Sequence, residues 1–273
     1  MKRACVLFLL VAVLRAAPAR YRISDGQAKG PGSPPLVLLH DDQAGVEAAI
    51  APVEGGELSG FRVRFRGGWV ETLYRARDYT PQPGWRGKAP FLWPATGRSV
   101  SQGEKTVADT QDGGWFSNGK RYPMGIHGFV KDMPWHVERR GADESGARVI
   151  LSVRDNPETR TRYPFGYKIT VEYELSGGAL SVRYAVSADS ANRGAMPFSA
   201  GNHITFRAPL IEGSQPEQMR VTTPSMVELM KEPPGLPNGK SRLRSLAGGI
   251  ALGELEQRSA VSLSDCKKIT IAL

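Results

Sequence analysis

Cysteine is scarce in this chain of 273 residues, which contains only Cys5 and Cys266. Cys5 lies in an N-terminal stretch with the pattern of a signal peptide, so the mature chain would keep Cys266 alone. A single cysteine cannot form an internal disulfide. We therefore expect a hydrophobic core to hold the fold, and a mature length of about 250 residues is enough for one all-β domain.

Long runs of basic residues are also absent, because no run of lysine or arginine exceeds two residues. The formal net charge is +9, and it falls to +6 when a signal peptide containing Lys2, Arg3, Arg15 and no acidic residue is removed. In the segment 62–66, Arg-Val-Arg-Phe-Arg, the charges alternate with apolar residues, as on the solvent face of a strand. We expect no nucleic-acid partner.

No apolar run reaches the roughly 20 residues that a membrane-spanning helix needs. The apolar stretch from Cys5 to Leu14 is shorter, follows Lys2 and Arg3, and precedes an A-x-A cleavage pattern at residues 17–19. These features predict a signal peptide over residues 1–19. We expect a secreted or periplasmic protein without stable membrane insertion after cleavage.

Common cofactor and metal motifs are missing. The chain has no G-x-G-x-x-G before a helix, no G-x-x-x-x-G-K-[ST], no H-E-x-x-H and no cysteine pair for zinc. No two histidines are spaced two or four residues apart, as ligands on one strand or helix would be. We expect no metal and no cofactor, although a scattered metal site from His127, His136 and His203 is an alternative.

What the sequence does contain is a series of strand patterns. Apolar and polar residues alternate from Tyr167 to Leu175, a Ser-Gly-Gly turn follows at 176–178, and the alternation resumes from Leu180 to Val186. This pattern predicts an antiparallel hairpin with one buried face. Shorter candidate strands, separated by Gly, Pro, Asp and Asn, are Phe61–Phe65, Val70–Tyr74, Arg148–Val153, His203–Phe206, Met219–Thr222, Ser259–Leu263 and Lys268–Leu273. The fold class is therefore all-β, a sandwich or barrel.

The segment from Trp85 to Val137 is the candidate site. It is rich in proline, tryptophan and glycine, and it contains two of the four histidines. Gly125 and Gly128 flank His127 and leave the backbone free for unusual φ and ψ angles, which suits an imidazole that points into a pocket from a turn. His127 alone could be a turn histidine bonded to a carbonyl.

Two motifs in this order resemble a known family. The first motif consists of P-F-L-W-P-A-T-G-R at 90–98 and Y-P-M-G-I-H-G-F at 122–129. The second is P-F-S-A-G-N-H-I-T-F at 197–206. Together they resemble the histidine segments of the aldose 1-epimerase (galactose mutarotase-like) family. The resemblance covers roughly Val46 to Leu210. It implies an antiparallel β-supersandwich and the interconversion of α and β anomers of a hexose or related sugar.

The resemblance also assigns roles. His203 matches the family's acid at the ring oxygen, and His127 matches the histidine that assists at the substrate. Arg98 matches an arginine that lines the sugar pocket, and Arg86 is a second candidate. For the aromatic residues, a flat platform for a sugar ring competes with core packing, which we expect to apply to at least half of them; the platform candidates are Trp93 and Phe129, with Trp115 and Phe116.

The family's general base is a glutamate near the C-terminus, and nothing after Ser264 resembles its segment. Glu254 and Glu256 are the last glutamates. We expect a signal peptide at 1–19, a leader and first strand at 20–45, and a C-terminally incomplete mutarotase-like domain at 46–273. The alternatives are a non-catalytic carbohydrate-binding module and a sugar-phosphate 1-epimerase, against which export argues. The sequence leaves the oligomeric state open.

Overall fold

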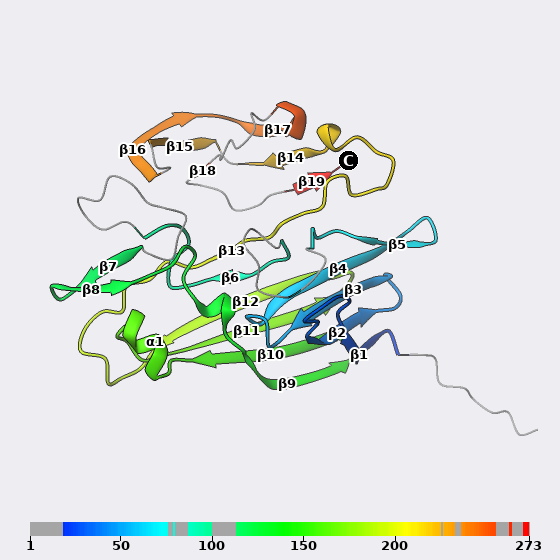
Figure 1. Ribbon diagram of the computed structural model, residues 1–273. Coiled ribbons are helices and arrows are strands. Elements are labelled where there is room, and N and C mark those ends of the chain that lie inside the picture. The colour runs from blue at the N-terminus through cyan, green and yellow to red at the C-terminus, as the bar shows by residue number, and fades with distance from the viewer. Residues whose placement is uncertain are drawn as a thin grey trace, which may run out of the picture.

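Two antiparallel sheets form the body of the protein in the computed structural model (Figure 1). The structure describes residues 19–75, 79, 87–99, 113–224, 226–232, 236–254, 262–263 and 270–272. Residues 1–18, almost all of the predicted signal peptide, lie outside this part of the chain. The predicted all-β, antiparallel fold class is confirmed.

The first sheet has five strands in sequential order. They are β1 (Tyr21–Gln27), β2 (Pro35–Asp41), β3 (Val46–Ala51), β4 (Glu57–Phe65) and β5 (Gly68–Glu71). Residues 20–45, which the sequence assigned to a leader and first strand, supply β1 and β2. Each strand pairs antiparallel with its neighbour, so the chain needs only short turns between them.

The second sheet confirms the predicted hairpin. Its strands are β9 (His136–Asp143), β10 (Gly146–Arg154), β11 (Tyr167–Ser176) and β12 (Ala179–Ala188), in the order β12-β11-β10-β9. Every odd-numbered residue of β11 from Tyr167 to Leu175 is buried, as the alternation predicted. The turn between β11 and β12 contains Gly177 and Gly178, whose φ angles of 57° and 75° suit glycine.

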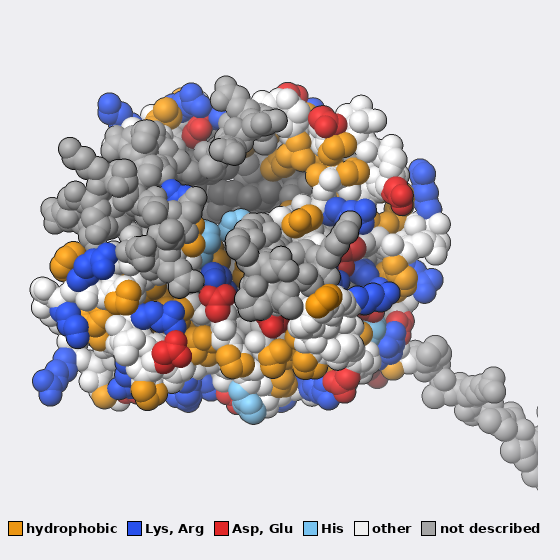
Figure 2. Space-filling view, in the orientation of Figure 1, with side chains coloured by type: hydrophobic (Ala, Val, Ile, Leu, Met, Phe, Trp, Pro, Cys, Tyr) orange, Lys and Arg blue, Asp and Glu red, His pale blue; other side chains and the backbone are white. Residues whose placement is uncertain are grey.

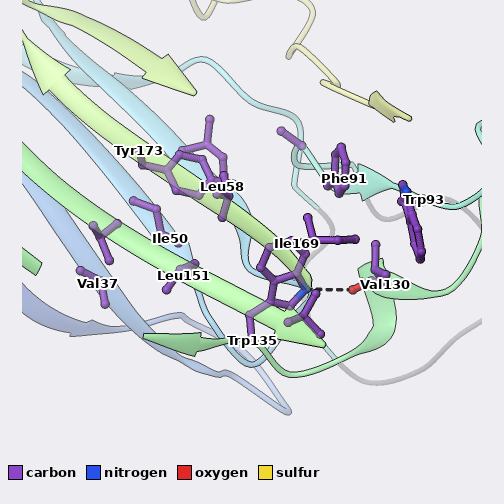
Figure 3. Packing of buried hydrophobic residues seen from close by; sticks show 14 of the residues in the cluster. Val37, Ile50, Leu58, Phe91, Trp93, Val130, Trp135, Leu151, Ile169 and Tyr173 are labelled. Atoms are coloured by element: carbon purple, nitrogen blue, oxygen red, sulfur yellow. Dashed lines mark hydrogen bonds between the residues drawn. The ribbon is translucent and has the colours of Figure 1, made fainter. Parts of the chain in front are cut away.

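The core lies where the two sheets pack together (Figure 3). Val37 and Ile50 come from the first sheet, whereas Leu151, Ile169 and Tyr173 come from the second. All five side chains are at most 4% exposed. Burying a side chain of this size stabilises the fold by about 1.5–3 kcal/mol.

Short elements connect and cover these sheets. They are β6 (Phe91–Leu92), β7 (Gly114–Ser117), β8 (Lys120–Pro123), η1 (Val130–Asp132), α1 (Pro157–Arg162), β13 (Gly201–Asn202), η2 (Pro216–Gln218), β14 (Arg220–Thr223), β15 (Val227–Glu232), β16 (Leu236–Leu243), β17 (Leu246–Ala251), η3 (Leu252–Glu254), β18 (Ser262–Leu263) and β19 (Thr270–Ala272). Strands β14 to β19 lie at the top of Figure 1 and form two three-stranded sheets. None of the helices in the described ranges is long and apolar enough to cross a membrane.

The strand predicted at His203–Phe206 is shifted. The regular strand is β13, at 201–202, and only Phe206 of the predicted range makes a bridge, to Leu73. The His203 N–H donates to the carbonyl of Pro90 at 3.0 Å. Since proline has no N–H to donate in return, the reciprocal hydrogen bond of a regular ladder is missing at Pro90.

A buried carboxylate joins β2 to the turn of the second sheet. Asp41, whose side chain is fully buried, accepts hydrogen bonds from the Arg20 guanidinium at 2.9 and 3.0 Å. It also accepts the N–H groups of Ala44 and Gly178 at 3.0 and 2.9 Å. The hydrogen bond from Arg20 is the main reason why the pKa of Asp41 falls from 3.8 to about 2.

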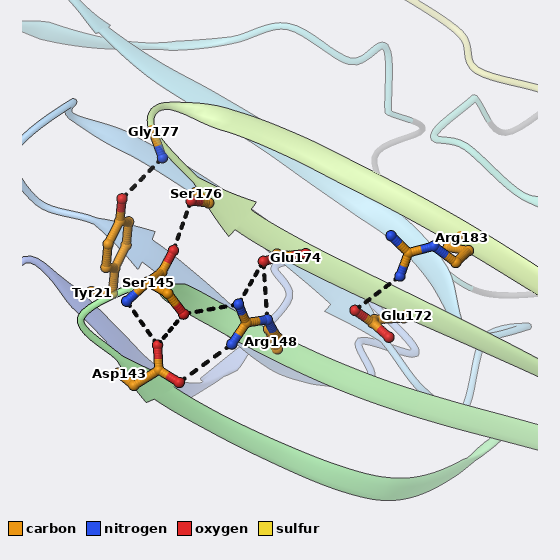
Figure 4. A network of polar contacts seen from close by, with 9 residues as sticks. All are labelled: Tyr21, Asp143, Ser145, Arg148, Glu172, Glu174, Ser176, Gly177 and Arg183. Atoms are coloured by element: carbon orange, nitrogen blue, oxygen red, sulfur yellow. Dashed lines mark hydrogen bonds and ion pairs between the residues drawn. The ribbon is translucent and has the colours of Figure 1, made fainter.

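Further polar contacts lie along the same end of the molecule (Figure 4). The Tyr21 hydroxyl accepts the N–H of Gly177 at 2.9 Å, which ties β1 to the β11–β12 turn. Arg148 donates to Glu174 at 2.7 Å and to Asp143 at 3.3 Å, across three strands of the second sheet. Because these last groups are partly exposed, each pair contributes little on its own.

We expect D41N to lower the free energy of unfolding at pH 7 by about 2 kcal/mol, because the substitution removes a buried, charge-assisted contact. The Asp41 carboxyl has a depressed pKa, so its contribution is complete above 3.8 and is lost as the pH falls through about 2. Urea denaturation at pH 7 and pH 3 should show a smaller difference at pH 3. The control is D42N, since Asp42 forms an exposed pair with Arg22; an equal loss in D42N would contradict the assignment.

Candidate functional site

One extended segment, residues 87–98, carries the two peptide stretches that contain His127 and His203. On its first half, the N–H of Thr205 donates to the carbonyl of Lys88 at 2.8 Å and that of His203 to Pro90 at 3.0 Å. Strand β13 then pairs with β6, placing Gly201 opposite Leu92. The backbone of the segment therefore fixes the register of the His203 stretch.

The second half of the segment holds His127. The His127 N–H donates to the carbonyl of Gly97 at 3.0 Å, and the Phe129 N–H donates to that of Trp93 at 3.1 Å. The Nδ1 atom of His127 lies 3.0 Å from the carbonyl oxygen of Thr96. Because a carbonyl only accepts, Nδ1 carries a proton, and Nε2 is the atom whose protonation changes when the ring titrates.

The result is a pair of imidazoles from positions 76 residues apart. The ring centroids of His127 and His203 are 5.5 Å apart, and the rings are nearly perpendicular, at 78°. Both side chains are half-buried. Histidine side chains lie at the hollow in the middle of the face drawn in Figure 2. The structure thus brings together the two residues that the motifs singled out.

The pKa of His127 is lower than its ordinary value of 6.5. Burial is the largest cause, and the positive charges of His203 and Lys131 act in the same direction, while the bond to Thr96 opposes them. His127 is therefore mainly neutral at pH 7. A neutral imidazole with a protonated Nδ1 can accept a proton or a hydrogen bond at Nε2.

The turn around His127 differs from the expectation in one detail. His127 itself has a φ of 67° and Gly128 a φ of 70°, whereas Gly125 does not have a positive φ. A Cβ atom at Gly128 would lie 2.1 Å from the carbonyl oxygen of Trp93, but one at Gly125 would meet nothing within 4 Å. The turn therefore needs glycine at 128 and not at 125.

The arginines have different outcomes. Arg98 is half-buried and directly follows Gly97, the residue whose carbonyl holds His127. It belongs to the segment that carries both histidines, so it stays a candidate for sugar binding. Arg86 lies outside the described residues.

Two predicted platform residues are part of the core. Trp93 is 0% exposed and Phe129 is 2% exposed, and their rings meet edge to face at 6.1 Å. A sugar cannot reach either ring, so the platform interpretation is wrong for both, and core packing explains them. Of the other aromatics, Trp115 is half-buried and Phe116 is 54% exposed.

Three residues at the segment were not singled out from the sequence. Lys88 and Thr96 accept the bonds described above through their carbonyls, and Asn202 donates to the Tyr184 hydroxyl at 2.9 Å. The Tyr184 ring stacks on Phe91 at 4.0 Å. The only signal in the sequence was their position: Lys88 lies two residues before P-F-L-W-P-A-T-G-R, Thr96 lies within this motif, and Asn202 directly precedes His203.

The remaining candidates lie elsewhere. His40 is buried against Ser24 and Glu47 on the first sheet, and His136 is exposed at the start of β9. Glu254 is exposed in η3 and lies 4.0 Å from Arg220, while Glu256 is outside the described residues. Within the described ranges, no group of three or more His, Cys, Asp or Glu side chains is placed to hold a metal ion.

We expect G128A to destabilise the protein by about 2 kcal/mol or more. The new methyl group must displace the Trp93 carbonyl, and the alanine must adopt a left-handed backbone conformation. G125A is the matched control and should change the free energy of unfolding by less than about 1 kcal/mol. Urea denaturation of both variants measures the difference. Equal stability of the two variants would show that the turn does not depend on Gly128.

Comparisons with known proteins agree with this fold. A family model described as aldose 1-epimerase matches residues 40–241. The chromosomal protein LacX of Lactococcus lactis subsp. lactis is 27% identical over 133 residues, which are 49% of this chain and 41% of LacX. The match therefore spans less than half of that relative.

Solved structures show the same fold. A galactose mutarotase-like protein from Lactobacillus casei has a TM-score of 0.63 at 24% identity, covering 91% of this chain and 75% of that chain. One from Clostridium acetobutylicum has a TM-score of 0.62 at 23% identity, covering 81% and 65%. Galactose 1-epimerase from Lactobacillus acidophilus has a TM-score of 0.59 at 18% identity, covering 84% and 64%. With the family model matching most of its length, the chain belongs to the aldose 1-epimerase family.

Proposed function

We propose that this protein interconverts the α and β anomers of a hexose or related sugar by acid–base ring opening. The observation that carries the proposal is the pair of imidazoles, His127 and His203, held with ring centroids 5.5 Å apart on one backbone segment of an aldose 1-epimerase family member. Two imidazoles this close to one another suit a reaction that moves two protons, because a histidine side chain can act as an acid or as a base.

The chemistry sets what the residues must do. A base removes the proton of the C1 hydroxyl while an acid protonates the ring oxygen, so the bond between C1 and the ring oxygen breaks and an open-chain aldehyde forms. Rotation about the bond between C1 and C2 and the reverse steps give the other anomer. We assign the acid at the ring oxygen to His203 and the assisting role to His127.

The state of the His127 ring supports this division. His127 has Nδ1 fixed on the Thr96 carbonyl and a lowered pKa, so it is suited to receive a hydrogen bond from a sugar hydroxyl at Nε2. His203 is left as the residue that delivers a proton. The general base stays unassigned, because Glu254 is exposed beside Arg220.

Substrate binding is proposed for Arg98 and, as a second candidate, Arg86. A guanidinium presents several N–H donors in a fixed plane and can hold sugar hydroxyls or a ring oxygen. The substrate is proposed to be a free sugar, as the name galactose 1-epimerase of a structural relative indicates for that protein. We further propose that the protein acts outside the cytosol, because its first 19 residues have a signal-peptide pattern.

Polarimetry tests the proposal directly. Freshly dissolved α-glucose and α-galactose should reach their equilibrium rotation faster with the protein than in buffer alone. Tryptophan fluorescence is titrated with the same sugars in parallel. Saturable quenching without any acceleration would replace the enzyme with a carbohydrate-binding module, and neither effect with any sugar tried would contradict both functions.

We expect H203A to lower the mutarotation rate by about 10² to 10⁴, the usual contribution of a general acid. H127A should lower it less, because His127 assists and does not deliver the proton to the ring oxygen. H136A is the matched control, since His136 is exposed on β9, and it should keep the wild-type rate. Wild-type activity in H203A would remove the assignment of the acid.

A further inference from the structure

A buried ion pair lies at the start of the segment that carries the two histidines. The Nζ atom of Lys88 is 2.7 Å from Oε1 of Glu57, and the two residues are only 3% and 5% exposed. Lys88 Nζ also lies 4.0 Å from the centre of the Tyr79 ring. Lysine and glutamate are rarely buried to this extent, because removing both charges from water is costly.

The backbone of Lys88 is in a left-handed conformation, with a φ of 65° that follows the 73° of Gly87. A side chain at Gly87 has no room, since a Cβ atom would lie 2.2 Å from the carbonyl oxygen of Tyr74. For a lysine this conformation is strained and persists only when surrounding contacts hold it. The ion pair with Glu57 is such a contact.

Both backbone groups of Lys88 are used in this conformation. Its N–H donates to the carbonyl of Tyr74 at 2.7 Å, and its carbonyl accepts the N–H of Thr205 at 2.8 Å. The neighbouring hydrogen bond between the same two stretches joins the His203 N–H to the carbonyl of Pro90. A rotation of the Lys88 peptide would therefore move the stretch that contains His203.

Glu57 supplies the fixed end of the pair. It is the first residue of β4 and pairs with Ala51 of β3 in the five-stranded sheet. The next residue, Leu58, accepts the N–H of Ala89 at 3.1 Å. The carboxylate is thus fixed at the start of a strand of the five-stranded sheet, and the lysine reaches it from the segment.

We propose that the Lys88–Glu57 ion pair is a positioning device that sets the placement of His203 relative to His127. The inference rests on the proposed function of the two histidines. His127 is attached to the far end of the segment, at Thr96 and Gly97, and His203 to the near end, beside Lys88. The separation between the two rings therefore depends on how the near end is anchored.

The variant K88M tests this proposal, because methionine keeps much of the length and apolar volume of the lysine side chain without its charge. K88M leaves a buried carboxylate behind, so the double variant E57Q/K88M, with no charge at either position, is examined beside it. The control is K168M, since Lys168 forms a more exposed pair with Glu138 at 3.0 Å.

The first readout is the nuclear Overhauser effect between the imidazole protons of His127 and His203 in histidine-labelled protein. We expect it in wild type and K168M, and we expect its loss in K88M and E57Q/K88M at temperatures where these remain folded by circular dichroism. The second readout is the mutarotation rate. We expect kcat to fall about tenfold or more in both variants, as for a misplaced catalytic group, with a smaller change in KM.

The two readouts separate the two hypotheses. If wild type does not accelerate mutarotation, the proposed function fails, and the imidazole contact alone still decides whether the ion pair positions His203. If K88M does not fold, E57Q/K88M decides. Retention of both the wild-type contact and the wild-type kcat in a folded variant without the pair would overturn the proposal.

Discussion

The site depends on one constraint, which is that a single stretch of backbone accepts hydrogen bonds from both histidine segments. Residues 88–97 offer their carbonyls to Thr205 and His203 at one end and to Phe129 and His127 at the other. Main-chain bonds of this kind do not depend on side-chain rotamers, so they fix distances more firmly than surface contacts do. His127 and His203, which are far apart in sequence, come together because each is hydrogen-bonded to this same short segment.

The hydrophobic core and a buried ion pair hold this backbone segment. The core packs against Trp93, and the Lys88–Glu57 ion pair lies at the start of the segment. Trp93, in its middle, is fully buried and packs on Phe129 and Tyr163. Figure 3 shows Phe91 and Trp93 next to the side chains of the sheet core. Two of the aromatic residues proposed as a platform for a sugar, Trp93 and Phe129, therefore support the site from the core instead.

The sequence was informative where a pattern reflects a repeated physical requirement. The alternation in 167–175 predicted β11 because one face of an antiparallel strand must be buried, and the two histidine motifs singled out two imidazoles that the fold brings together. The sequence was uninformative where a conformation depends on residues that are close in space but distant in sequence. The local sequence does not show that His127 has a positive φ or that Trp93 is buried. It also does not show that Lys88 pairs with Glu57 of β4. These depend on packing between segments distant in sequence.

The closeness of His127 and His203 has an electrostatic consequence. A charge on one ring disfavours a charge on the other, as the effect of His203 on the pKa of His127 shows. The two rings are therefore electrostatically linked, and the neutral form of His127 is favoured. For the proposed reaction, two neighbouring imidazoles offer one group that can give a proton and one that can accept a proton, and either anomer would meet both.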